Sequence, residues 1–249
     1  MIAVVSPAKK LITKAVFPEN LPFTEPLFKA KAAYLADYLR KLSPAELQSL
    51  MHISDRLART NYERFQQWEE QGSVPAVFLY NGDTYRGLDI ASFPPDKLAD
   101  LQDHVRIISG LYGLLRPLDL INPYRLEMKT PLKTAVAGDL YEFWRDDVTD
   151  ALREQLQGQP LVNLASKEYA QVIDKERLDA PFIQVDFKDL HNGRYKTMGL
   201  YAKRARGNMA RWIALNKPEK PEDLKAFDGL GYRFNPEMSS ENHLVFTRG

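Results

Sequence analysis

Residues 106–120 read RIISGLYGLLRPLDL, a buried-strand pattern that breaks at two glycines three positions apart. Val105, Ile107 and Ile108 at its start are apolar and β-branched, which favours a buried strand. Gly110 and Gly113 permit backbone conformations or close contacts that a side chain would forbid. Pro117 restricts Arg116 to extended geometry, which holds that guanidinium outside a helix. The stretch predicts a buried strand followed by a long, structured loop where a functional site could lie. A buried strand followed by an irregular connection without a functional role fits the same residues.

On either side of this stretch, apolar runs and helical spacing predict further elements. Strands are expected at 2–5, 77–80, 161–165, 182–187, 195–200 and 243–246, and Asn192-Gly193 predicts a hairpin between the fourth and fifth of these. Helices are expected at 29–42, 94–101, 141–156 and 201–213. At 249 residues the chain can bury a sizeable core, and we expect one large domain over 1–249.

The segment 44–68 contains two helix-start signals. Ser43 is followed by Pro44 and, three residues after the serine, by Glu46, which is the pattern of a capping box. A second possible cap follows at Ser54. The pattern predicts two short helices joined by a tight bend, and one longer bent helix is equally compatible with it.

Charge is distributed unevenly along the chain, although the net charge is only +1. Residues 190–218 contain seven Lys and Arg and no acid, and residues 1–18 contain three Lys and no acid, so these two segments together carry +10. Solvated helix faces usually mix the two signs of charge. The separation therefore favours a localised positive field for an anionic partner.

Cysteine is absent, which excludes disulfides and thiolate metal sites and fits a reducing compartment. The apolar start ends at Ser6-Pro7 with lysines after it rather than before it, unlike a signal peptide, and no apolar run reaches membrane-spanning length. We therefore expect a cytoplasmic protein, monomeric and without a membrane partner.

Catalytic and metal-binding motifs are few. The four histidines are scattered, and no P-loop, G-x-S-x-G elbow or dinucleotide fingerprint occurs, so we expect no metal and no cofactor. Asp83, Asp119 and Glu127 follow predicted strands and could hold Mg²⁺ together with substrate phosphates. Capping or turn roles are the simpler explanation for these carboxylates.

Several cationic side chains suit phosphate contact. The candidates are Lys9, Lys10, Arg116, Arg125, Lys203, Arg204, Arg206 and Arg211. Helical spacing places Lys203, Gly207 and Arg211 on one line, so we expect the glycine to leave a groove between two cations. Arg116 and Lys203 each follow an apolar strand pattern, and we expect them to face the same cleft.

Six blocks, in order along the whole chain, resemble the YaaA family of bacterial peroxide-stress proteins. They are Ser6-Pro7-Ala8-Lys9, Leu111-Tyr112-Gly113 with Arg116–Leu120, Pro123–Met128, Leu140-Tyr141 with Phe143-Trp144, Asn163–Ser166, and Tyr201-Ala202-Lys203 with Ala205-Arg206-Gly207. The resemblance implies a single mixed α/β domain whose sheet is surrounded by helices. It also implies a positively charged cleft, a helix-hairpin-helix element, which maps to 44–68, and DNA binding. The bend within 44–68 lacks the glycine that is usual in such hairpins.

Two hypotheses about function follow. The first, implied by the resemblance, is a DNA-binding protein of the peroxide response that limits damage from free iron, with backbone contacts, weak sequence preference and no established catalysis. The second is an enzyme acting on a nucleotide or another phosphate-bearing small molecule in the same cleft. Its candidate catalytic residues are Lys9, Asp83, Asp119 and Glu127, as phosphate clamp, metal ligand or general base.

Overall fold

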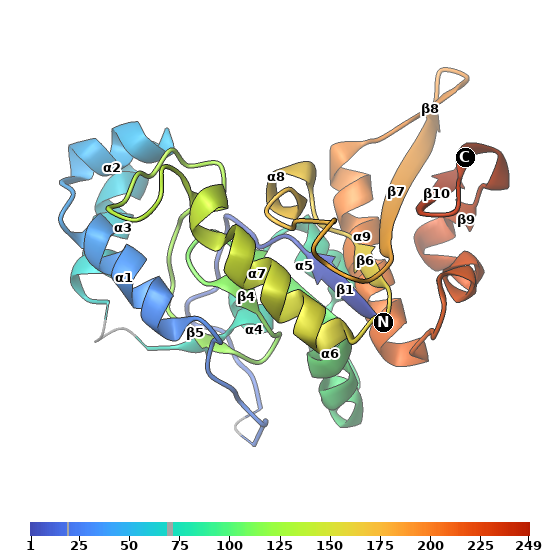
Figure 1. Ribbon diagram of the computed structural model, residues 1–249, viewed down its shortest axis with the longest axis horizontal. Helices are drawn as coiled ribbons and strands as arrows, with labels where there is room; N and C mark the ends of the chain where they lie inside the picture. Colours follow the sequence, from blue (N-terminus) through green and yellow to red (C-terminus); the bar gives the residue numbers. More distant parts are fainter. Residues whose placement is uncertain (19, 69–71) are drawn as a thin grey trace.

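The computed structural model describes residues 1–18, 20–68 and 72–249 (Figure 1). Its strands are β1 (Ile2–Val5), β2 (Val74–Pro75), β3 (Val105–Ser109), β4 (Gly113–Leu115), β5 (Leu120–Ile121), β6 (Leu161–Asn163), β7 (Phe182–His191), β8 (Arg194–Lys196), β9 (Arg233–Phe234) and β10 (His243–Arg248). Its α-helices are α1 (Lys29–Arg40), α2 (Pro44–Met51), α3 (Asp55–Gln66), α4 (Ala76–Leu79), α5 (Asp83–Leu88), α6 (Leu98–His104), α7 (Leu140–Leu156), α8 (Lys167–Ala170) and α9 (Gly199–Asn216). Short 3-10 helices are η1 (Ile90–Ser92), η2 (Pro95–Lys97), η3 (Pro221–Ala226), η4 (Gly229–Gly231) and η5 (Pro236–Met238).

Within these described residues, eight strands form one mixed sheet in the order β4-β3-β1-β6-β7-β10-β9, with β8 paired to β7. The central pairs β3–β1, β1–β6, β6–β7 and β7–β10 are parallel. The pairs that β4, β8 and β9 make are antiparallel, and β2 and β5 form a separate antiparallel pair. The mixed sheet confirms the predicted α/β fold class.

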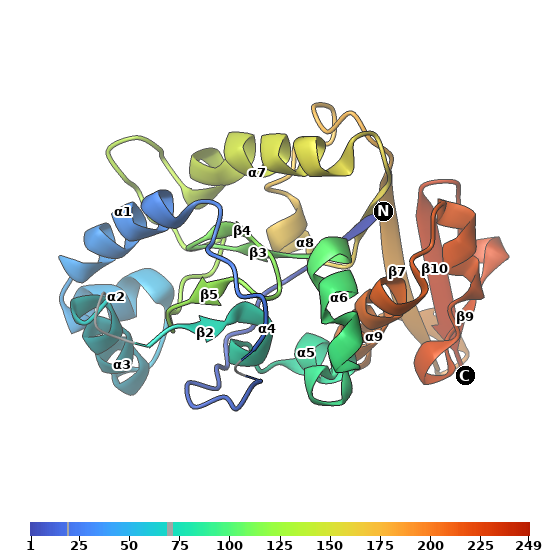
Figure 2. The same cartoon turned by 90° about the horizontal axis from the view of Figure 1, so that it is seen from below.

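Helices cover both faces of this sheet (Figure 2). The long helix α7 lies on one face, whereas α6 and α9 lie on the other, and α1, α2 and α3 gather at one end of the molecule. Every residue of β1, β3 and β6 is buried as a result. This double cover explains why these strands appear in the sequence as continuous apolar runs.

The glycines of the central stretch make a tighter structure than the expected long loop. Ser109 at the end of β3 pairs with Gly113 at the start of β4, and Gly113 has φ 69°, which favours glycine. A Cβ at Gly110 would lie 2.5 Å from the carbonyl oxygen of Leu126, so this position requires the missing side chain. The chain therefore turns back at once, and its long irregular segment begins only after β5, at residues 122–139.

The segment 44–68 forms two helices, α2 and α3, and not one bent helix. The Ser43 side chain accepts a hydrogen bond from the Glu46 amide and the Glu46 carboxylate accepts one from the Ser43 amide, which is the predicted capping box. His52 ends α2 with φ 50°, and the Ser54 hydroxyl accepts from the Leu57 amide at the start of α3. The two caps force separate helices with a bend of three residues between them.

Two strand predictions are corrected. Residues 77–80 do not form a strand, because the chain forms β2 at Val74–Pro75 and then the single-turn helix α4. A short buried apolar run is compatible with either structure, and here the amide of Val77 bonds to the carbonyl of Pro117 from a distant segment. The hairpin at Asn192-Gly193 is confirmed, with φ of 50° and 72°, but its second strand ends at Lys196 and α9 begins at Gly199.

No helix in the described part of the chain is long and apolar enough to cross a membrane.

Candidate functional site

A pocket of about 460 Å³ opens at the carboxyl ends of β1 and β6. The next strand of this sheet after β1 is its neighbour β3, whereas the next after β6 is β7 on the other side, so the strand order reverses between β1 and β6. Open parallel sheets bind ligands at such a position. Four segments line the pocket. Two are continuous, Ser6–Lys10 after β1 and Asn81–Arg86 at the start of α5. The segment after β6 contributes Leu164, Ser166, Glu168 and Tyr169, and α9 contributes Lys203 and Arg206.

Hydrogen bonds hold the loop after β1 in place. The Ser6 hydroxyl accepts from the Ser166 amide at 2.9 Å and donates to the Ser166 hydroxyl at 3.3 Å, which ties this loop to the one after β6. On the other side, the Tyr85 hydroxyl donates to the carbonyl of Ser6 at 3.2 Å, and the Asn81 amide donates to the carbonyl of Lys10 at 2.8 Å. The pocket walls are therefore linked to one another before any ligand arrives.

Cations dominate the polar lining. Lys10 and Lys203 are exposed and pair with no carboxylate among the residues that the structure describes. The Arg206 side chain is 16% exposed, and its Nη2 lies 3.9 Å from Asp186. Its Nε has no hydrogen-bond partner within the described part of the chain. Burial lowers the pKa of Arg206 from its ordinary value. A buried and incompletely paired guanidinium next to two unpaired ammonium groups suits an anionic ligand.

Two carboxylates face these cations. Asp83, the first residue of α5, lies 3.7 Å from Nη1 of Arg86 and 3.7 Å from Nε of Arg204. Glu168 of α8 lies on the opposite side, where its Oε1 accepts from the Lys129 amide at 3.5 Å. Buried tyrosines Tyr85 and Tyr169 complete the wall, and burial raises the pKa of both phenols, so each stays a neutral hydrogen-bonding group.

Glu127 lies beside the pocket, in a small adjoining recess that Lys9 also lines. Its carboxylate is 2.7 Å from Nζ of Lys9 and 2.9 Å from Nη2 of Arg125. Glu127 and Arg125 are 11% and 16% exposed, whereas Lys9 is 59% exposed and reaches the pocket. The arrangement makes Glu127 an anchor for two cations of the predicted site.

Asp119 stabilises a turn, which was the simpler of the two roles considered for it. It is 1% exposed, and its carboxylate accepts from the Thr24 hydroxyl at 2.5 Å and from the Arg116 amide at 2.7 Å. Nε of Arg116 lies 3.4 Å from the same carboxylate. Neither residue is part of the pocket lining. The expectation that Arg116 shares a cleft with Lys203 is therefore wrong for this pocket.

The expected groove at Gly207 is also wrong. A Cβ at Gly207 would overlap the carbonyl oxygen of Thr84, so the glycine lets α9 cross α5 in direct contact. Arg211, one turn further along α9, points to the end of α5 and donates to the carbonyls of Leu88, Asp89 and Ser92. Arg204 lines a separate cavity described below.

Sequence reasoning missed several pocket residues, among them Ser6, Arg86, Ser166 and Glu168. Ser166 and Glu168 directly follow a strand that was predicted, so the strand-end rule that selected Lys9 could also have found them. Arg86 was missed because no helix was predicted after the expected strand at 77–80, whereas this residue lies in α5. Within the described residues no group of three or more His, Cys, Asp or Glu is arranged to hold a metal ion.

Comparison with known proteins supports the resemblance over nearly the full length. The sequence profile described as "Peroxide stress protein YaaA" matches residues 1–238. The chain belongs to the YaaA family of peroxide stress proteins. It is also similar over its whole length to UPF0246 proteins, 48% identical to one of Idiomarina loihiensis (98% of that protein covered), 47% to one of Laribacter hongkongensis (99%) and 42% to one of Crocosphaera subtropica (100%). A role in the peroxide stress response follows from membership of the YaaA family.

Proposed function

We propose that this YaaA-family chain serves the peroxide stress response by binding a phosphate-bearing ligand of nucleotide size in the strand-end pocket. The observation that carries the proposal is the convergence of three cations on one cavity: Lys10 and Lys203, which pair with no carboxylate among the described residues, and Arg206, whose ion pair with Asp186 is long at 3.9 Å. The volume of about 460 Å³ lies in the range of small-molecule sites, roughly 300–1,000 Å³. Phosphate oxygens would complete the hydrogen bonds that Arg206 lacks.

The same pocket contains groups that could act on such a ligand. Asp83 and Glu168 are the carboxylates of the lining, and each could accept a proton as a general base. Mg²⁺ usually binds through one or two carboxylates plus substrate phosphates, so these two residues would suffice for a ligand-dependent metal. If the protein is an enzyme, the general base or metal ligand would therefore be Asp83 or Glu168 and not Asp119, which is a buried turn residue.

A mononucleotide titration tests this proposal. Calorimetry with thymidine 5′-monophosphate should show binding to the wild-type chain. Lys203→Ala should weaken it about tenfold or more, because few charges hold a ligand in such a pocket. Arg116→Ala is the matched control, since Arg116 pairs with Asp119 outside the pocket, and its affinity should stay within about twofold. Failure of the wild-type chain to bind the nucleotide would overturn the proposal.

DNA binding is a second proposed function, favoured by the exposed cations at the pocket rim. Lys9, Lys10 and Lys203 could contact backbone phosphates without a base-reading element. In this proposal the protein acts in the cytoplasm as a monomer. Cations that neutralise DNA phosphates release the counterions held there. Displacement of bound iron from DNA would then limit the damage caused by free iron and peroxide.

Salt dependence tests DNA binding. Affinity for a duplex should fall steeply with salt, and Lys203→Ala should lower the slope by about one unit. Cleavage of the duplex by ferrous iron and peroxide should decrease when the protein is added. An affinity independent of salt, or cleavage unaffected by saturating protein, would contradict this second proposal.

A further inference from the structure

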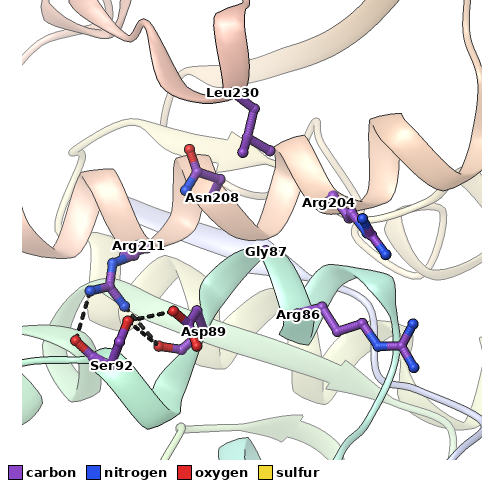
Figure 3. Close-up of a pocket in the computed structure, with 8 residues that line it drawn as sticks. All are labelled: Arg86, Gly87, Asp89, Ser92, Arg204, Asn208, Arg211 and Leu230. Carbon is purple, nitrogen blue, oxygen red and sulfur yellow. Dashed lines mark hydrogen bonds between the residues drawn. The ribbon is translucent and has the colours of Figure 1, made fainter.

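A second cavity, of about 480 Å³, lies between α5 and α9 beside the strand-end pocket. Figure 3 shows the arginines of its two walls, with Leu230 of η4 above them. Its lining residues are Arg86, Gly87, Asp89, Ser92, Arg204, Asn208, Arg211 and Leu230. Arg86 also lines the strand-end pocket, so one side chain belongs to both cavities.

The boundary between the two cavities has an excess of positive charge. Asp83 lies 3.7 Å from both Arg86 and Arg204, so one carboxylate faces two guanidinium groups, and neither contact is short enough for a hydrogen bond. Nε of Arg204 is buried and has no hydrogen-bond partner among the residues that the structure describes. These arginines are therefore held near each other, and their side chains stay 54% and 44% exposed, so part of each guanidinium can be reached by a ligand.

At the far end of the cavity, the polar side chains already have hydrogen-bond partners within the protein. Arg211 donates to the backbone carbonyls of Leu88 and Asp89 at the end of α5 and of Ser92 at the end of η1, and the Ser92 hydroxyl bonds to the Asp89 carboxylate. An incoming anion would therefore meet Arg86, Arg204 and the amide of Asn208, not Arg211. Leu230, 47% exposed, adds an apolar surface above them.

We infer that the two cavities together bind a single-stranded nucleotide segment with at least two phosphates, one phosphate in each cavity and Arg86 between them. The inference rests on the proposed phosphate-binding function of the strand-end pocket. A mononucleotide would fill that pocket alone. A phosphodiester-linked dinucleotide would bring its second phosphate to Arg204 at high effective concentration, and its sugar or base would contact Leu230. Cavities of this size suit unpaired nucleotides, since a duplex could not enter either one.

The experiment compares thymidine 5′-monophosphate with the 5′-phosphorylated thymidine dinucleotide by calorimetry. The wild-type chain should bind the dinucleotide about tenfold more tightly, as expected for one added charge-assisted phosphate contact. Arg204→Gln should remove that gain and leave the mononucleotide affinity within about twofold. Asn208→Asp, which places a negative charge in the second cavity without changing side-chain size, should do the same.

Arg153→Gln on α7 is the matched control, because Arg153 and Arg204 are both 44% exposed and each lies near one aspartate. It should keep the full dinucleotide preference, and thermal unfolding should show that all three variants are folded. Equal affinity of the wild-type chain for the two ligands would overturn this inference and leave the proposed function standing. Equal weakening of both ligands by Asn208→Asp would also overturn it. Binding of neither ligand would overturn the proposed function itself, and this inference with it.

Discussion

Gly207 of α9 and Thr84 of α5 lie in direct contact, and a Cβ at position 207 would overlap the Thr84 carbonyl oxygen. The contact is reciprocal, since a Cβ at Gly87 of α5 would overlap the carbonyl oxygen of Arg204. These two glycines set the distance between the helices that carry Asp83 and Arg86 on one side and the basic residues of α9 on the other. The geometry of both cavities therefore depends on this helix crossing.

Gly207→Ala should destabilise the fold, although alanine usually stabilises a helix interior relative to glycine. The added methyl group has to push α9 away from α5, and overpacking of this kind costs about 1–3 kcal/mol. Urea unfolding would measure the loss. Gly199→Ala is the matched control at the start of the same helix, where no atom lies within 4 Å of the new methyl group. Equal stability of Gly207→Ala and the wild type would show that the helices can separate freely.

Arg211→Gln should lower stability by about 2–3 kcal/mol, because the charged guanidinium donates to three backbone carbonyls, two at the end of α5 and one at the end of η1. Arg211 also lies 5.0 Å from the Phe93 ring, which adds a cation–π contact. Chemical denaturation is the measurement. Arg59→Gln, which removes an arginine that is 66% exposed and paired with Asp55, should cost clearly less because solvent screens an exposed pair. The same small loss in both variants would refute a structural role for Arg211.

Asp119→Asn should change how stability depends on pH. Burial raises the pKa of Asp119 above its ordinary value of 3.8, despite hydrogen bonds from Thr24 and Arg116 that lower it. The native protein therefore binds this proton more tightly than the unfolded chain does. The stability that the proton provides is fully present below pH 3.8 and is lost as pH rises through the pKa of the folded state. The free energy of unfolding of the wild type, relative to that of Asp119→Asn, should accordingly fall with rising pH. Urea unfolding of both proteins at several pH values measures this difference. A difference that stays constant or increases with pH would contradict the prediction.

Glu127→Gln should cost about 3–5 kcal/mol of stability, because it leaves the largely buried Arg125 without its carboxylate partner. Glu25→Gln is the exposed comparison. Glu25 and its partner Lys29 are 73% and 65% exposed, so this variant should cost less than about 1 kcal/mol. Thermal and urea unfolding of both variants provide the measurement. If the two losses were similar, Glu127 would not be an anchor for the cations beside the pocket.

Local sequence determined the elements whose signals lie within a few residues of one another. Ser43 and Glu46 cap α2, and the Asp139 side chain caps α7 by accepting from the Glu142 amide. Asn192-Gly193 makes the hairpin of β7 and β8. These features were predictable because capping and turn formation need only neighbouring backbone groups.

The sequence also determined most of the core strands and part of the candidate site. The apolar runs of β1, β3 and β6 indicate strands buried on both faces. Of the predicted cations and carboxylates, those that line the strand-end pocket are Lys9, Lys10, Asp83, Lys203 and Arg206. All five were selected by position after a predicted strand or within an acid-free basic segment, without knowledge of the fold.

Only the tertiary structure decided which of those side chains meet. Arg116 and Lys203 have similar local contexts, yet β4 lies at one edge of the sheet and carries Arg116 away from the pocket, whereas β1 and β6 lie side by side and form it. Gly207 has the spacing of a groove residue and is instead a helix contact. Residues 77–80 have a strand pattern, yet the first three of them belong to α4. In each case the deciding contact comes from a residue far away in the chain, Thr84 for Gly207 and Pro117 for Val77. Periodicity along the chain cannot specify a partner across the fold, so strand order and helix crossing set the site.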